Sequence, residues 1–296
     1  MKKLAVLLLS LCMSAAVSAQ SQISIVTTIK PLQLIASDLL GDLGSVEALI
    51  PAGASPHHYS MKPSDLRKLQ QADLAIWVGP ELEGFLVKSL KSTDAPVIQL
   101  MGGSEHKEDE HEHHEEEEHE AHHHDHGGED PHVWMDPELM LSASIEITEQ
   151  LIEQFPDHKL QLQRNQERFA SQLKQIDDEN RALLQPYKQI GFIVFHDAFG
   201  RLIEHYGLNQ QAYITVDPAR APGARKLAQI QSLIVDSGVK CVFIEPQFEA
   251  AVVRRIVEGL PIRLGQLDPL AMDAQVDAGY AAYLQALTRS IEHCLR

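Results

Sequence analysis

The sequence predicts an α/β fold built from two similar halves that one long helix connects. Short apolar runs rich in β-branched residues alternate with segments of helical periodicity, which is typical of parallel sheets covered by helices. The same alternation occurs before residue 157 and after residue 185, although no exact repeat is present. Without its leader and one charged run the chain keeps about 250 residues, enough for one large or two modest cores.

Hydrophobic periodicity and turn residues predict the elements of each half. In the first half, residues 20–156, we expect strands at 23–29, 45–50, 74–78 and 97–100 and helices at 31–40, 64–71 and 81–91. In the second half, residues 186–296, we expect strands at 191–195, 211–215, 242–245 and 262–264 and helices at 224–235 and 249–259.

Residues 157–185 predict the connecting helix. This stretch contains no Gly or Pro, its apolar residues recur at helical spacing, and Pro186 ends it. At 1.5 Å per residue the helix is about 42 Å long, which is enough to run along both halves. An ordinary surface helix within one domain would show the same periodicity.

Residues 1–19 have the composition of a secretory signal peptide. Two lysines precede an apolar stretch that ends in small residues and is too short to span a membrane. We therefore expect the mature chain to begin near Gln20 and to lie in the periplasm. Only Cys241 and Cys294 then remain, and an exported chain with two thiols usually joins them in a disulfide. Two free buried thiols or a thiolate metal site are the alternatives.

Residues 104–130 form a run of histidine and acid within the first half. Thirteen acidic residues and one lysine give it −12 of the formal charge of −17, and it contains no apolar residue larger than alanine. Such a segment cannot offset the entropy of ordering, and dense histidine is typical of weak metal binding. The run either gathers zinc or is a passive insertion. Its histidines, the expected auxiliary ligands, are His106, His111, His113, His114, His119, His122, His123, His124 and His126.

Outside this run the chain is only mildly acidic. Basic residues are nowhere concentrated, which argues against a nucleic-acid partner. No second apolar segment approaches the length of a membrane span.

Three histidines outside the run stand beside turn residues after predicted strands or loops. They are His57, His132 and His196, and His196 ends a buried-looking strand at the edge where α/β sheets bind ligands. Asp268 follows the last predicted strand and is the natural fourth donor. Three imidazoles and one carboxylate suit tetrahedral Zn(II).

Several neighbouring groups have candidate supporting roles. Asp136 and Asp197 are expected to hold imidazole N–H groups or to cap the next helix, and Glu245 is expected either to line the site or to cap a helix. His58 is not expected to bind the same ion as His57, because neighbouring side chains in an extended segment point in opposite directions. The remaining histidines outside the run are interpreted as surface residues: His158, His205 and His293.

The chain resembles the zinc-specific metal-binding receptors of ABC importers, the ZnuA group, along almost its whole length. The segments that carry the resemblance are residues 26–32, 53–59, 63–65, 130–137, 195–200 and 241–248. The resemblance implies two α/β lobes with parallel sheets, a rigid long helix that joins them, and a metal site in the cleft between the lobes. It implies a monomeric receptor without enzymatic activity that delivers Zn(II) to an inner-membrane permease.

The resemblance also assigns residues. It places the three metal-binding histidines at His57, His132 and His196, the carboxylate at Asp268, and the disulfide at Cys241 and Cys294. Some zinc-binding members carry a glutamate where this chain has Pro56, so the fourth ligand is Asp268 or a water. Zinc binding by imidazoles is expected to weaken below about pH 6.5, where they take up protons.

Two other classes of function compete with import. A secreted zinc hydrolase also uses three histidines and a water, but the chain contains no HxxEH or GxSxG motif. An adhesin on the same scaffold would bind metal without a permease. Neighbouring genes for a permease and an ATPase would distinguish a receptor from an adhesin.

Overall fold

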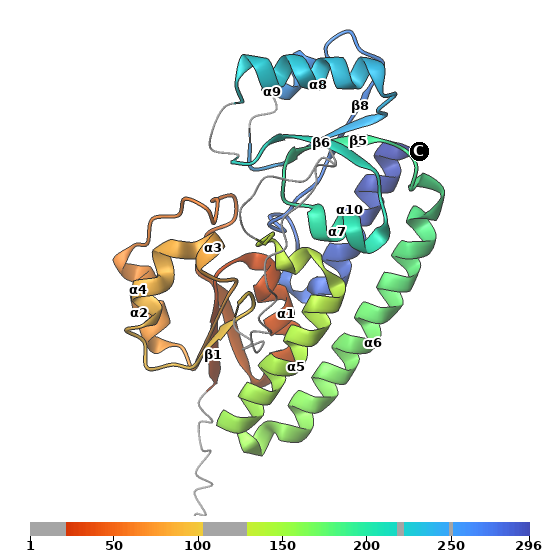
Figure 1. Ribbon diagram of the computed structural model, residues 1–296. Helices are drawn as coiled ribbons and strands as arrows, with labels where there is room; N and C mark the ends of the chain where they lie inside the picture. The colour runs from red at the N-terminus through yellow and green to blue at the C-terminus, as the bar shows by residue number, and fades with distance from the viewer. Residues whose placement is uncertain (1–21, 103–128, 218–221, 249–250) are drawn as a thin grey trace, which may run out of the picture.

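The computed structural model of the chain describes residues 22–102, 129–217, 222–248 and 251–296 (Figure 1). The expected signal peptide, residues 1–19, lies outside the described residues. So does the His/acid run from residue 104 to residue 128, with all nine of its histidines. Among the described residues, no helix has the length and apolar character needed to cross a membrane.

The first half forms a four-stranded parallel sheet in the order β2-β1-β3-β4. Its strands are short apolar runs close to those expected from the sequence. They are β1 Ile23–Thr27, β2 Gly44–Ala48, β3 Leu74–Trp77 and β4 Val97–Gln99. The helices of this half are α1 Lys30–Leu40, α2 Pro63–Gln71, α3 Pro80–Glu83 and α4 Val87–Leu90. The single helix expected at 81–91 is instead divided into α3 and α4 by a 3₁₀ turn at Gly84–Leu86. The turn begins at a glycine, which is an unfavourable residue within an α-helix.

The second half repeats the same sheet topology in the order β6-β5-β7-β8, again with parallel pairing throughout. The strands are β5 Phe192–His196, β6 Gln210–Thr215, β7 Cys241–Ile244 and β8 Arg263–Gln266. The helices are α7 Gly200–Tyr206, α8 Ala224–Asp236 and α9 Ala251–Val257. The predicted α/β class with two parallel sheets is therefore confirmed.

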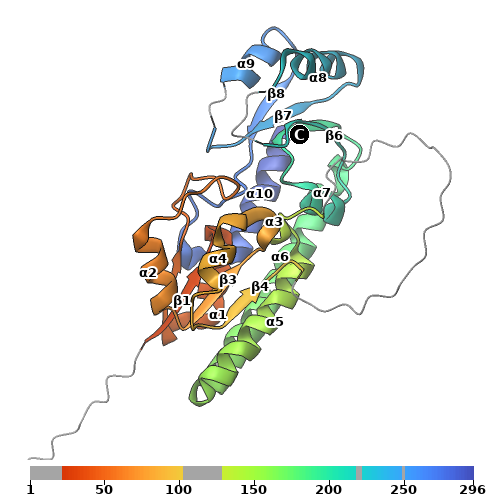
Figure 2. The ribbon, with the colours of Figure 1, turned by 60° about the vertical axis from the view of Figure 1, so that its left-hand side comes forward.

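Three long helices pass beside the two sheets: α5 Pro137–Gln154, α6 Lys159–Leu184 and α10 Gly279–Leu295. Figures 1 and 2 show α6 running alongside both lobes, as the sequence predicts. The helices α5, α7 and α10 were not expected from the sequence. The helix α10 follows the second sheet in the sequence, yet it packs against α1 of the first half and against α6. The domain boundaries at residues 156 and 186 stay a prediction.

The two lobes share one hydrophobic core. It combines the inner faces of both sheets with α1, α5, α6 and α10, while two smaller clusters lie on the outer faces of the sheets. Asp38 on α1 accepts a hydrogen bond from the N–H of Tyr280 at 2.9 Å, and a Cβ on Gly279 (φ 77°) would come within 2.6 Å of the same carboxylate. The expected disulfide between Cys241 on β7 and Cys294 on α10 is present. The shared core and the contact between α1 and the start of α10 therefore join the lobes in addition to the long helix α6, while the disulfide ties α10 to the second sheet.

Candidate metal centre

His57 lies on the loop of residues 51–62, between β2 and α2. This loop follows the carboxyl end of a parallel strand, the edge at which such sheets place ligands. The Nε2 atom of His57 is buried and has no hydrogen-bond partner within the described part of the chain. The loop therefore carries one ring nitrogen into the space between the lobes.

His132 lies just before the 3₁₀ turn Val133–Met135, and its side chain is held by Asp130. One carboxylate oxygen of Asp130 lies 2.7 Å from Nδ1 of His132 and 3.0 Å from its backbone N. Because Nδ1 donates to this carboxylate, the lone pair lies on Nε2, which points into the site. His132 is only 4 % exposed, and its Nε2 has no partner among the residues described.

The role of Asp130 was not expected from the sequence, because this residue is the last of the His/acid run at 104–130. The position two residues before His132 is the signal that could have revealed it. Arg201 on α7 holds the segment in place by donating from two guanidinium nitrogens to the backbone oxygen of Asp130, at 2.8 and 2.6 Å. The end of the run is thereby fixed to the second lobe.

His196 is the last residue of β5 and is 4 % exposed. Its Nδ1 lies 3.6 Å from a carboxylate oxygen of Glu245, which follows β7 and is 3 % exposed. This distance is too long for a hydrogen bond, so the contact is electrostatic. The central position of β5 between β6 and β7 sets the position of both side chains.

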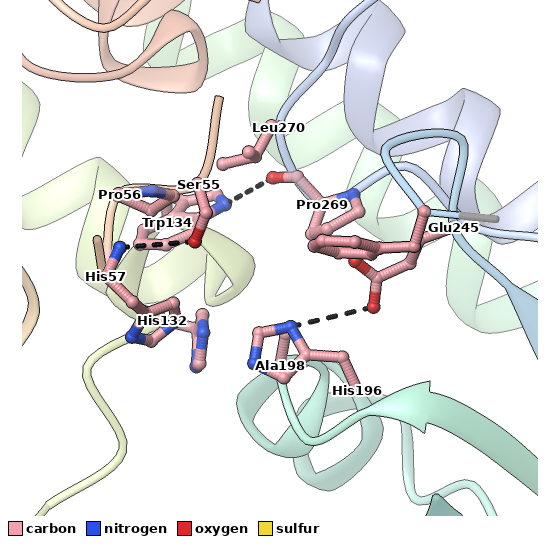
Figure 3. Close-up of a pocket in the computed structure, with 11 residues that line it drawn as sticks. Ser55, Pro56, His57, His132, Trp134, His196, Ala198, Glu245, Pro269 and Leu270 are labelled. Carbon is pink, nitrogen blue, oxygen red and sulfur yellow. Dashed lines mark hydrogen bonds and ion pairs between the residues drawn. The ribbon is translucent and has the colours of Figure 1, made fainter. Parts of the chain in front are cut away.

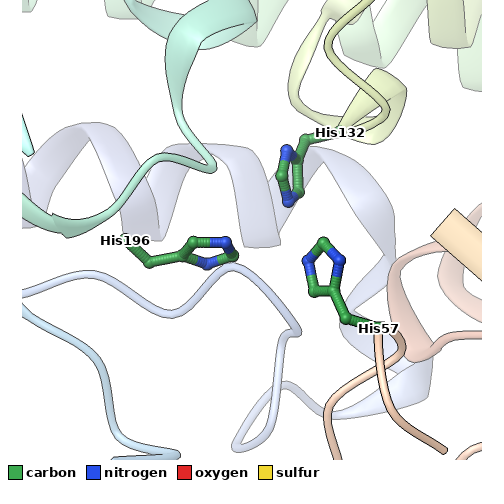
Figure 4. Close-up of side chains that lie close together, drawn as sticks. All are labelled: His57, His132 and His196. Carbon is green, nitrogen blue, oxygen red and sulfur yellow. The ribbon is translucent and has the colours of Figure 1, made fainter. Parts of the chain in front are cut away.

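The three imidazoles converge although they are far apart in the sequence (Figure 4). One ring nitrogen from each of His57, His132 and His196 lies within 4.8 Å of the other two. Tetrahedral zinc with bonds of about 2.0–2.1 Å holds its ligand atoms about 3.3 Å apart, so a modest contraction brings all three into range. Among described histidine, cysteine and acidic residues, this is the group that the geometry identifies as able to hold a metal ion.

Burial favours the neutral form of two of these rings, His57 and His132. Burial and then the neighbouring imidazoles of His132 and His196 lower the pKa of His57 to about 3. Burial also lowers the pKa of His132, although Asp130 opposes the shift. The sequence alone placed the loss of metal binding near pH 6.5. The lowered pKa values of His57 and His132 favour neutral rings to lower pH than an ordinary imidazole would allow, so proton competition with a metal ion would be weaker at these two positions.

The site is a small, partly open cavity of about 20 Å³, with room for about one ion or one water (Figure 3). Apolar groups of both lobes complete its wall. Trp134 donates from Nε1 to the backbone oxygen of Pro269 at 2.7 Å, which fixes the wall beside His132. The other residues lining the cavity beside the three histidines and Glu245 are Ser55, Pro56, Ala198, Phe248 and Leu270.

Asp268 lies outside this lining. Its carboxylate accepts hydrogen bonds from the backbone N–H groups of Leu270 at 3.1 Å and Met272 at 2.5 Å, and from the side chain of Gln247 at 3.2 Å. Burial raises the pKa of Asp268, with these backbone hydrogen bonds acting in the opposite direction. In this structure Asp268 shapes the turn that presents Pro269 to the site.

The structure gives different positions and contacts to Asp136, Asp197 and His205. Asp136 caps α5 by accepting from the N–H groups of Glu138 and Leu139 at 2.8 and 3.2 Å. Asp197 contributes its backbone N–H to Thr215 at 3.2 Å and does not line the cavity. His205 is not the surface residue expected from the sequence, because its ring is buried and its Nε2 lies 2.7 Å from Asp177 on α6.

Residues 25–294 match the family model described as zinc-uptake complex component A, periplasmic. The chain belongs to the ZnuA family. It is 36 % identical over 290 residues to the high-affinity zinc uptake system protein ZnuA of Yersinia pestis, covering 92 % of this chain and 91 % of that protein. The ZnuA protein of Haemophilus ducreyi is 37 % identical over 295 residues, covering 94 % of this chain and 95 % of the relative.

The fold agrees with this membership. A solved structure of a zinc-bound ZnuA variant that lacks residues 138–173 in its own numbering superposes with a TM-score of 0.76 at 27 % identity. The match covers 93 % of this chain and 98 % of that one. ZnuA proteins are components of zinc uptake and not enzymes, so the hydrolase alternative is excluded.

Proposed function

We propose that this protein is the periplasmic receptor of a zinc importer and that it captures Zn(II) through the Nε2 atoms of His57, His132 and His196. The observation that carries the proposal is the convergence of three buried ring nitrogens that lack hydrogen-bond partners among the described residues. Leaving such groups unpaired costs free energy, which a metal ion recovers on binding. Family membership in zinc uptake supports the choice of cargo.

Two carboxylates outside the ligand set support the choice of a divalent ion. Asp130 orients His132, and Glu245 faces the Nδ1 atom of His196. The hydrogen bond to Asp130 fixes His132 in one tautomer and makes its free ring nitrogen a stronger metal ligand. Three neutral imidazoles carry no charge, so the two carboxylates compensate the two positive charges of Zn(II).

A water fills the fourth position in this proposal. The alternative from the sequence is Asp268, but its carboxylate already accepts three hydrogen bonds and does not line the cavity. A receptor must also release its cargo, and an N₃ site with one exchangeable position suits release better than a closed site. Asp268 would bind only after giving up its contacts with Leu270 and Met272.

Delivery is the second half of the proposed function. The signal-peptide pattern at residues 1–19 supports export, and the family description places the uptake component in the periplasm. A monomer carrying zinc between its lobes would dock on an inner-membrane ABC permease and release the ion there. The His/acid run would raise the local zinc concentration near His132, or else act as a passive insertion.

Chelator competition on a chain lacking residues 104–128 tests the ligand set. The deletion should leave one tight zinc site while lowering the total zinc bound. Alanine at His57, His132 or His196 should each abolish the tight site. His293→Ala, which removes an exposed histidine on α10, serves as the matched control and should bind as the parent does. Tight stoichiometric binding that survives all three substitutions would refute the proposal.

A further inference from the structure

A hydrogen bond joins the two lobes beside the metal site. The Nε2 atom of His58 lies 3.0 Å from a carboxylate oxygen of Asp217. His58 directly follows His57 on the loop of residues 51–62, and Asp217 lies just after β6 in the other lobe. The side chain of His58 is 53 % exposed and that of Asp217 is 22 % exposed, and neither residue lines the cavity.

The three histidines are positioned by different contacts. His132 is held by Asp130, and His196 is held by the ladder of β5. For the segment 51–58, every other hydrogen bond recorded between described residues stays within the segment. The bond from His58 to Asp217 is therefore its only hydrogen-bonded link to the rest of the described chain.

Asp217 is in turn fixed to the strand that carries His196. Its backbone N–H donates to Oγ1 of Thr215 at 3.2 Å, and that hydroxyl donates back to the Asp217 carbonyl at 2.8 Å. Thr215 pairs with His196 in the parallel ladder of β5 and β6. The contact thus joins the loop that carries His57 to the frame that carries His196.

We propose that His58 and Asp217 form a cross-lobe latch that positions His57 and slows zinc release. The proposal rests on the proposed function, because it concerns retention at the same site. The two lobes share one hydrophobic core, so in this proposal it is the loop that moves to let the ion leave. Nε2 of His58 can carry the donated hydrogen in both the neutral and the charged ring, so the latch requires no change of protonation.

Stopped-flow chelator chase on the full mature chain tests the latch. Zinc is loaded at half an equivalent, so that the tightest site is filled first, and association is measured separately by rapid mixing with zinc. Asp217→Ala should raise the release rate about twofold to fivefold, the range expected for a partly exposed pair, and leave the association rate unchanged. Asp217→Asn keeps an acceptor oxygen and should release nearly as slowly as the wild type. Asp236→Ala removes an exposed charge from the same lobe and is the control.

The pair is then tested as a unit. His58→Ala combined with Asp217→Ala should release zinc no faster than the faster single variant, because both remove one contact. Unchanged release from Asp217→Ala, or additive effects in the double variant, would overturn the latch. So would a slower association rate with unchanged release, which would assign the pair to capture. A wild-type chain that binds no tight zinc would instead refute the proposed function.

Discussion

Asp130→Ala should weaken zinc binding without unfolding the protein. The substitution removes the carboxylate that accepts from Nδ1 of His132 at 2.7 Å and from its backbone N at 3.0 Å. The ring of His132 then loses its fixed tautomer and orientation. Removing such a partner of a metal-bound histidine typically costs 10- to 100-fold in affinity, or about 1.4–2.7 kcal/mol. The contacts of Arg201 survive, because they go to the backbone oxygen of Asp130.

Asp136→Ala is the matched control, since it removes a carboxylate from the same segment. Asp136 caps α5 and does not line the cavity. Its loss should cost about 1 kcal/mol of stability and change zinc affinity by less than twofold. Asp130→Asn keeps an acceptor but no charge, so its affinity should lie between those of the wild type and Asp130→Ala.

Competition with a calibrated chelator measures the affinities, and urea unfolding measures the stabilities. Asp130→Ala with wild-type zinc affinity would refute the inference that this carboxylate orients His132. Equal losses of affinity in Asp130→Ala and Asp136→Ala would refute it as well, because the effect would then come from disturbance of the segment.

Three further predictions follow from burial and chain connectivity. A site of three ordinary imidazoles would lose roughly a thousandfold in zinc affinity between pH 7.5 and pH 5.5. Because the pKa values of His57 and His132 are lowered, the loss of affinity measured by calorimetric titration should be far smaller. A full thousandfold loss would contradict this prediction. Burial raises the pKa of Glu83 from 4.5 to about 7, so the folded state binds this proton more tightly than the unfolded state does. The free energy of unfolding should therefore fall by about 3 kcal/mol from pH 4.5 to pH 8, and urea unfolding of Glu83→Gln should lack this component. A difference in stability between the two proteins that does not change with pH would count against it. Replacing both Cys241 and Cys294 by alanine opens a link across 53 residues and should cost about 4 kcal/mol, and the variant should no longer respond to reductant as the wild type does.

The strands and the long helix could be predicted because their patterns are local. The four strands of each half are compact apolar runs between turn residues, and α6 lacks helix breakers over its whole length. The helix α10 was missed although Tyr280, Tyr283, Leu284, Leu287 and Ile291 follow helical spacing. The sharing of one core between the lobes could not be predicted, because periodicity shows which face is apolar and not which element covers it.

The candidate site divides in the same way. His57, His132 and His196 could be selected because each lies beside turn residues at the end of a strand or loop, but spacings of 75 and 64 residues show nothing about convergence. The three histidines converge because the sheet topology places the ends of the parallel strands close together. The role of Asp130 could not be recognised, because this residue ends a run that contains twelve other acidic residues. The sequence placed Asp268 correctly after the last strand, yet could not show that backbone N–H groups occupy its oxygens.

An anomalous difference map at the zinc K-edge, from crystals of the mature chain with one equivalent of zinc, tests the account most directly. We expect one strong peak bonded to the Nε2 atoms of His57, His132 and His196, with a water as the fourth ligand. A principal peak elsewhere, or one bonded to fewer than three of these rings, would contradict it.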